Sequence, residues 1–142
     1  MLDPRTMKAI GRVIGKQAQT LAKQNETTAN DVIDLAPLLK PWKNGVYNTG
    51  DVVTHNGAPW RCITGHDSTG QANWEPGVAP SLFAPYHATD AEHALPWIAP
   101  TGAHDLYRAG EYMVYTDGKT YCCARDTNFS PNDYAQAWLV ME

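Results

Sequence analysis

The sequence predicts an α+β protein in which an N-terminal helical segment is followed by two small antiparallel β modules. Each module is expected to be a short three-stranded unit, based on a hairpin and holding an aromatic core. Three observations favour this class. Apolar residues follow helical spacing near the N-terminus. The 142-residue chain has 11 Gly, 10 Pro, 5 Trp and 7 Tyr but 2 Phe, which is typical of small, turn-rich cores organised around large rings. A pattern of aromatic, glycine and acidic residues then occurs twice.

The first element expected is a helix from Pro4 to about Lys23, with Asp3 as its cap. Its heptad positions alternate with a stripe of small residues. Two interpretations stay open: the helix packs on a partner through this smooth stripe, or it folds back on its own modules. The heptad positions are Met7, Ile10, Ile14, Gln17 and Leu21, and the stripe is Gly11, Gly15, Ala18 and Ala22.

A polar joint at residues 25–30 follows, and residues 28–39 offer a short second helix or a turn. The chain therefore divides into an attachment and oligomerisation segment at 1–40, a first β module at 41–87 and a second at 88–142. Isoleucine at the core positions Ile10 and Ile14 favours three helices over two, which predicts a homotrimer.

The two modules are defined by an internal repeat in which seven features recur in one order: Trp, Tyr, Gly-acid, turn-Gly, aromatic-x-Cys, aromatic-x-Pro and a final aromatic. The first copy has Trp42, Tyr47, Gly50-Asp51, Asn56-Gly57, Trp60-x-Cys62, Trp74-x-Pro76 and Phe83. The second copy has Trp97, Tyr107, Gly110-Glu111, Asp117-Gly118, Tyr121-x-Cys123, Phe129-x-Pro131 and Trp138.

Each copy carries a hairpin signal. Asn56-Gly57 and Asp117-Gly118 predict type I′ turns, because both central residues of that turn need positive φ. β-forming runs flank each turn, at 52–54 and 60–64 in the first copy and at 112–116 and 120–124 in the second. Residues 87–95, between the copies, are the one candidate for a further helix, which Pro96 would end.

This repeat resembles the carbohydrate-binding modules of family 5/12, the chitin-binding type, at residues 42–86 and less fully at 97–140. Similar tandem modules behind a helical leader occur in phage structural proteins, and the opening of the second copy at 96–105 looks like that subgroup. The resemblance implies sugar binding. It also shows a departure, because residues 63–68 and 124–127 lack the pair of tryptophans that hold the sugar in chitinase-linked modules. The resemblance therefore implies the fold more directly than it implies chitin binding.

Four residues are candidates for carbohydrate binding. Trp74 follows a polar stretch at 67–73, where loops carry function, and His66 precedes that stretch. Tyr86 and Tyr115 are the other two, Tyr115 because it occupies a strand position that need not be apolar. The aromatic residues that open each copy are expected to form the cores, as are Trp60-x-Cys62 and Tyr121-x-Cys123.

Composition and motifs exclude several other functions. Residues 1–24 carry five basic residues and one acidic one, and the overall net charge is −4, so the rest of the chain is acidic. An acidic body is not expected to bind nucleic acid. No stretch is apolar enough for a signal peptide or a membrane span. No catalytic motif and no metal-ligand spacing occurs among the five histidines, so no enzyme activity, metal or cofactor is expected.

The three cysteines, Cys62, Cys122 and Cys123, make a poor disulfide framework and are expected to be reduced and mostly buried. This indicates folding in a host cytoplasm and release by lysis within a particle. The sequence thus predicts a non-enzymatic, virion-associated protein that recognises a host surface glycan. Its N-terminal helix would contact other virion proteins of a phage tail or capsid. The alternative is a structural decoration or adaptor protein with no sugar binding.

Overall fold

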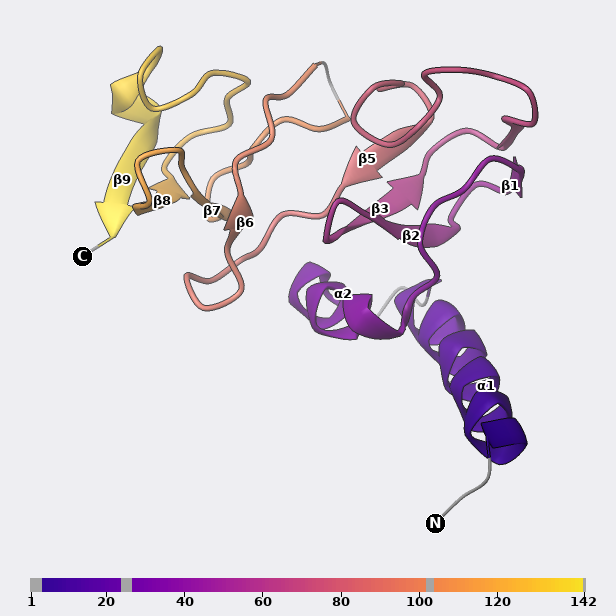
Figure 1. Ribbon diagram of the computed structural model, residues 1–142. Coiled ribbons are helices and arrows are strands. Elements are labelled where there is room, and N and C mark those ends of the chain that lie inside the picture. The colour runs from indigo at the N-terminus through magenta and orange to yellow at the C-terminus, as the bar shows by residue number, and fades with distance from the viewer. Residues whose placement is uncertain (1–3, 24–26, 102–103, 142) are drawn as a thin grey trace.

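The computed structural model describes residues 4–23, 27–101 and 104–141. Helix α1 (Pro4–Lys23), helix α2 (Ala29–Leu35) and the 3-10 turn η1 (Ala36–Leu38) precede the β structure. Two β-sheets lie side by side beyond them, and α1 projects away from both (Figure 1). This mixture of short helices and small sheets agrees with the predicted α+β class. No helix in the described part of the chain is long and apolar enough to cross a membrane.

Helix α2 begins at a capping box that the sequence Thr-x-x-Asp provides. The Thr28 hydroxyl accepts a hydrogen bond from the Asp31 backbone N–H at 3.2 Å, and the Asp31 carboxylate accepts one from the Thr28 backbone N–H at 3.3 Å. These bonds satisfy N–H groups that the first turn of a helix leaves unpaired. They stabilise a helix of only seven residues, which places Val32 in the core at 1% exposure.

The last turns of α1 pack on the rest of the chain. Ala18 and Ala22, from the stripe of small residues, are buried with Val32, Leu39 and Val52 in one cluster. This end of α1 therefore folds back on its own chain, and it does so through the small-residue stripe that the other interpretation assigned to a partner. Leu21 is 44% exposed. The side chains of the other apolar heptad residues, Met7, Ile10 and Ile14, lie outside the described residues.

The first sheet has the order β2-β3-β5 and is antiparallel, with β2 at Val52–His55, β3 at Ala58–Cys62 and β5 at Phe83–Pro85. Asn56 (φ 53°) and Gly57 (φ 80°) join β2 to β3, so both central residues of the turn have the positive φ predicted for them. One face of the sheet packs Val53, Trp60, Cys62 and Phe83 together. The other face meets α1 through Val52.

Two further strands pair beside this sheet. Strand β1 (Val46–Tyr47) is antiparallel to β4 (His66–Asp67), with Tyr47 opposite His66. Ser68, which is fully buried, fixes the end of β4: its hydroxyl accepts a hydrogen bond from the Gly45 N–H at 3.0 Å and donates one to the Gly45 carbonyl at 3.2 Å.

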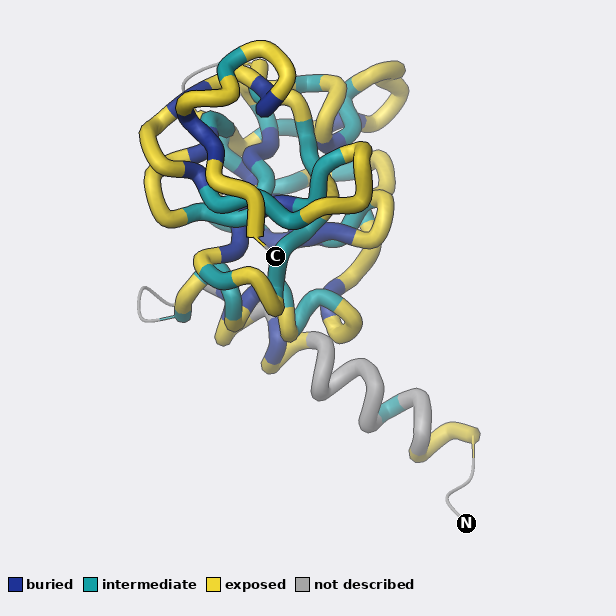
Figure 2. The backbone as a smooth tube through the Cα atoms, turned by 90° about the vertical axis from the view of Figure 1, so that its left-hand side faces the viewer, coloured by how far each residue is buried: buried dark blue, intermediate teal, exposed yellow. Residues whose placement is uncertain are grey.

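The second sheet has the order β6-β7-β8-β9, with β6 at Leu95–Pro96, β7 at Tyr112–Val114, β8 at Thr120–Cys123 and β9 at Trp138–Met141, after the 3-10 turn η2 (Ala135–Ala137). Strand β6 is parallel to β7 and the other pairs are antiparallel. The prediction of three strands is thus wrong for this sheet, because the residues before Trp97 add a fourth. Buried positions follow both sheets, and exposed loops surround them (Figure 2).

Two local predictions are wrong. At Asp117-Gly118 only Gly118 has positive φ (80°), and the Tyr115 N–H donates to the Lys119 carbonyl, so a three-residue loop with a bulged glycine replaces the type I′ turn. Residues 87–95 contain no helix: they form an isolated bridge at Ala88, bends and a turn, and Leu95 begins β6. The Asp90 carboxylate accepts from the His93 backbone N–H at 2.8 Å, which closes a turn in place of a helical hydrogen bond.

The same backbone hydrogen bonds occur at matching positions of the two repeats. In each copy the N–H of the opening Trp donates into the neighbouring strand, and the Gly-acid pair exchanges hydrogen bonds with the buried Cys. The first copy has Trp42 N to Thr54 O at 2.7 Å, Gly50 N to Cys62 O at 2.9 Å and Cys62 N to Asp51 O at 2.7 Å. The second has Trp97 N to Val114 O at 2.8 Å, Gly110 N to Cys123 O at 2.8 Å and Cys123 N to Glu111 O at 2.7 Å.

Large rings organise the core of the second sheet as well. Tyr107 is 1% exposed, stacks on Trp97 with ring centroids 5.1 Å apart, and packs with Met113, Cys123 and Trp138. Burial raises the pKa of Cys123 to about 11, so its thiol is protonated at neutral pH. Cys62 is buried too and Cys122 is half-buried, so the predicted burial holds for two of the three cysteines.

Candidate functional site

An aromatic corner lies at the β1–β4 end of the first sheet. His66, on β4, has its ring centroid 5.3 Å from that of Phe83 and 5.8 Å from that of Tyr47. Trp74, in the loop between β4 and β5, meets the other side of His66 edge-on at 6.2 Å. Trp74 is half-buried, and its indole nitrogen has no hydrogen-bond partner among the residues that the structure describes. One ring in a loop is thus backed by the core and partly open to solvent.

Hydrogen bonds fix the His66 ring. Its Nδ1 lies 2.7 Å from the Thr64 carbonyl oxygen, which can only accept, so Nδ1 carries the proton. In the neutral ring Nε2 is then an acceptor. It is buried and has no partner within the described part of the chain. The imidazole therefore has a set orientation and an unused acceptor beside Trp74.

The loop that carries Trp74 is held at both ends. Before Trp74, the Thr69 N–H donates to Asp67 Oδ1 at 2.9 Å, and hydrogen bonding from Thr69 lowers the pKa of the Asp67 carboxyl. After it, Pro76 is buried, and Gly77, whose positive φ of 89° favours glycine, lies within contact distance of the Trp60 ring, with an added Cβ 3.5 Å from Cη2. The position of Trp74 therefore depends on contacts with the core.

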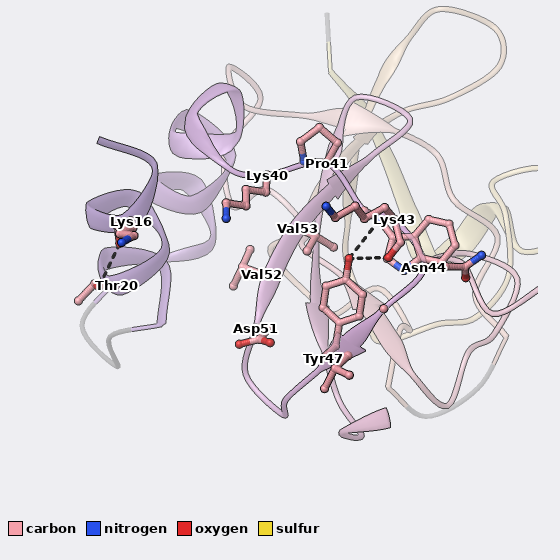
Figure 3. A pocket seen from close by; sticks show the side chains of 13 residues that line it. Lys16, Thr20, Lys40, Pro41, Lys43, Asn44, Tyr47, Asp51, Val52 and Val53 are labelled. Carbon is pink, nitrogen blue, oxygen red and sulfur yellow. Dashed lines mark hydrogen bonds between the residues drawn. The ribbon is translucent and has the colours of Figure 1, made fainter. Parts of the chain in front are cut away.

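A groove of about 820 Å³ runs between α1 and the first sheet (Figure 3). Trp42, Tyr47 and the exposed residues Lys40 and Lys43 contribute to its lining, as does Lys16 of α1. The Tyr47 hydroxyl donates to the Lys43 carbonyl at 2.8 Å and accepts from the Lys43 N–H at 3.1 Å, so it is already satisfied by the backbone. The groove combines an aromatic wall with three ammonium groups.

The second sheet has an exposed ring at the position that corresponds to Trp74. Phe129 is 59% exposed, although its carbonyl is fixed by a 3.0 Å hydrogen bond from the Trp138 indole. The sequence-based candidates did not include it. The repeated aromatic-x-Pro pattern, Trp74-x-Pro76 and Phe129-x-Pro131, was a signal that could have found it.

The four sequence-based candidates lie in three places. His66 and Trp74 come together at the aromatic corner. Tyr86 packs against the cluster of α1, α2 and β2, and burial raises the pKa of its hydroxyl. Tyr115 directly follows β7, outside the strand on which the sequence placed it, and its ring meets Trp97 and Tyr121 edge-on, each with centroids 5.9 Å apart. Tyr86 and Tyr115 thus belong to other surfaces.

The neighbours of His93 give it a structural role. Its Nε2 lies 2.9 Å from Asp34 Oδ2 of α2, and its Nδ1 lies 2.8 Å from Asp90 Oδ1. These two carboxylates raise the pKa of His93 to about 9. Asn30 adds hydrogen bonds to Asp90 and to the Thr89 N–H. No group of three or more possible metal ligands occurs among residues 4–23, 27–101 and 104–141.

Comparison with known proteins relates the first sheet to one family of modules. The model of carbohydrate-binding module family 5/12 matches residues 41–84, which include the groove wall at Trp42 and the aromatic corner. Modules of this family are carbohydrate-binding modules, which are generally not catalytic. The match supports one carbohydrate-binding module in this chain. No curated protein matches the sequence.

Proposed function

We propose that this chain is a non-enzymatic binding protein that recognises a polysaccharide through the aromatic corner, with Trp74 as the main contact and His66 beside it. The observation that carries the proposal is the half-open Trp74 ring inside the segment that matches a carbohydrate-binding family. A flat indole fits the apolar face of a pyranose ring. The Trp74 indole N–H, which has no partner among the described residues, supplies a donor for a sugar hydroxyl.

The strength of this contact follows from the area that it removes from water. Covering the open part of an indole removes on the order of 50–80 Å² of apolar surface, which contributes about 1–2 kcal/mol at ~25 cal/mol per Å². One such ring gives weak binding, because association also costs translational freedom and orders polar groups. A useful affinity therefore needs more than one site per particle or per chain.

We propose that the second sheet is a second module with Phe129 as its exposed ring. The matching backbone hydrogen bonds of the two Gly-acid-Cys networks support this, as does the shared order of aromatic residues. Two linked sites raise the apparent affinity by making the second contact intramolecular. Phe129 has no donor on its ring, so the second site is expected to be weaker than the first.

The proposed setting is a phage particle, with a glycan of the host surface as the ligand and α1 as the attachment segment. The resemblance to tandem modules of phage structural proteins supports this setting, and the projection of α1 away from both sheets leaves its N-terminal part available for contact (Figure 1). Assembly of α1 into a homotrimer would multiply the sugar sites. Light scattering on the purified chain tests that assembly.

The experiment that tests sugar binding is a glycan array with the full chain, repeated with Trp74→Ala. Loss of about 1–2 kcal/mol corresponds to roughly 5- to 30-fold weaker binding. Leu139→Ala is the matched control, since Leu139 is an apolar side chain 58% exposed on β9 and outside both proposed sites. Binding of no glycan by the wild-type chain, with its fold intact by circular dichroism, would favour a structural adaptor instead.

A further inference from the structure

A second cleft, of about 500 Å³, lies where the far side of the first sheet meets the chain of the second module. Arg61 of β3 and Arg108 both line it, with Tyr86, His87 and Glu111 also in its wall. Arg61 lies on the sheet face opposite the Trp60 and Cys62 side chains, because neighbouring residues of a strand point to opposite faces. The cleft is therefore separate from the aromatic corner of the first module.

The arginines give this cleft its charge. Arg61 is exposed and forms no ion pair with any residue that the structure describes. Arg61 and Tyr86 line the same cleft, and the positive charge of Arg61 lowers the pKa of the Tyr86 hydroxyl, opposing the larger effect of burial. Arg108 approaches Asp126 at 3.7 Å, but both side chains are more than half exposed, and such a pair contributes little. Both guanidinium groups thus stay available to an anion.

The one carboxylate in the wall is already engaged. Glu111 Oε1 accepts a hydrogen bond from the Arg108 N–H at 2.7 Å and lies 3.0 Å from His87 Nδ1. The His87 side chain is 7% exposed and stacks on Tyr107 with ring centroids 3.8 Å apart. Its Nε2 is buried with no partner in the described chain. These contacts hold Oε1 of Glu111 in place, and the cleft wall carries two guanidinium groups against one carboxylate.

We infer that this cleft binds the carboxylate of an acidic sugar, a hexuronic acid residue of the polysaccharide. A guanidinium matches a carboxylate with two parallel N–H donors, and the nearby Tyr86 hydroxyl offers a further donor. Pro85 and Leu106 supply apolar wall for a sugar ring, and the volume lies in the range of about 300–1,000 Å³ that small-molecule sites occupy. The inference deepens the proposed function, since it names a class of sugar that the chain prefers.

The test is isothermal titration calorimetry of the full chain with glucuronate, with glucose as the neutral control. Glucuronate is expected to bind saturably, more weakly at high salt, and glucose not to bind in this cleft. Arg61→Gln and Arg108→Gln are each expected to weaken glucuronate binding about tenfold or more, since each removes a charge-assisted pair. Arg61→Lys keeps the charge without the fork and should fall between Arg61→Gln and the wild type.

Controls separate this site from the aromatic corner. Arg5→Gln removes an exposed arginine of the same charge at the start of α1 and should leave glucuronate binding unchanged. Trp74→Ala should weaken binding of neutral oligosaccharides and spare glucuronate, so failure of one proposal is visible apart from failure of the other. The inference is wrong if glucuronate does not bind, if glucose binds equally well, or if both arginine variants bind like the wild type. Binding of inorganic phosphate without glucuronate would assign the cleft to a phosphate group and overturn it as well.

Discussion

The buried hydroxyl of Ser68 provides a test of how the binding loop is held. Ser68→Ala removes two hydrogen bonds to Gly45, at 3.0 and 3.2 Å, but keeps the backbone bond from Ser68 N to Gly45 O at 2.9 Å. The Gly45 N–H then loses its partner in a half-buried place, which costs about 1–3 kcal/mol. Because Ser68 directly follows β4, which carries His66, the variant should also loosen the aromatic corner and weaken sugar binding.

Urea denaturation followed by tryptophan fluorescence measures this change as a lower midpoint with an unchanged slope. Ser81→Ala is the matched control, since Ser81 is exposed and only its carbonyl is used, by the Thr64 hydroxyl at 2.9 Å. The control is expected to differ from the wild type by less than about 0.5 kcal/mol. If Ser68→Ala and Ser81→Ala have the same midpoint, the hydroxyl does not hold β4, and the account of the loop given above is incorrect.

Three further predictions follow from the second sheet, the inter-sheet turn and α1. Met113→Ala empties a fully buried site and should lower the free energy of unfolding by about 2–5 kcal/mol, whereas Met141→Ala, at a side chain 41% exposed, should change it by less than about 0.5 kcal/mol in the same urea experiment. The pKa of His93 is raised by Asp34 and Asp90, so its contribution to stability is complete below pH 6.5 and is lost as the pH rises through about 9. Melting temperatures from pH 6 to pH 10 should show this loss in the wild type and lack it in His93→Gln. Light scattering should give the mass of a trimer for the full chain, and a monomeric mass would contradict the heptad argument.

Local sequence patterns predicted those parts of the fold that local physics decides. The Asn56-Gly57 turn has positive φ at both positions, as that dipeptide favours. At Asp117-Gly118 the same reasoning was wrong, because a hairpin with a three-residue loop needs only one residue with positive φ. The helix predicted at residues 87–95 does not form because of tertiary contacts. Asp90 and His93 form hydrogen bonds with each other and with residues of α2, more than 50 residues earlier in the chain.

The candidate site was predicted only in part. Trp74 and His66 were found from a polar loop and a resemblance, but their contact depends on a loop fixed by Pro76, Gly77 and Trp60, whose arrangement no local pattern encodes. The basic cleft joins Arg61 to Arg108 across the two sheets, so it is visible only once both sheets are placed. Phe129 was missed for another reason: a position-by-position comparison of the two repeats would have identified it from the sequence alone.

The bonds between α2 and the inter-sheet turn have a mechanical consequence. Asn30 and Asp34 connect α2 sideways to Asp90 and His93, so the chain before the first sheet is cross-linked to the chain after it. A pulling force that enters through α1 therefore divides, one part passing through the first sheet and the other crossing directly to the linker. The first module therefore bears only part of the applied force, and the linker to the second module bears the rest. Above about pH 9, where His93 loses its charge, that bypass weakens and the first sheet should unfold at a lower force.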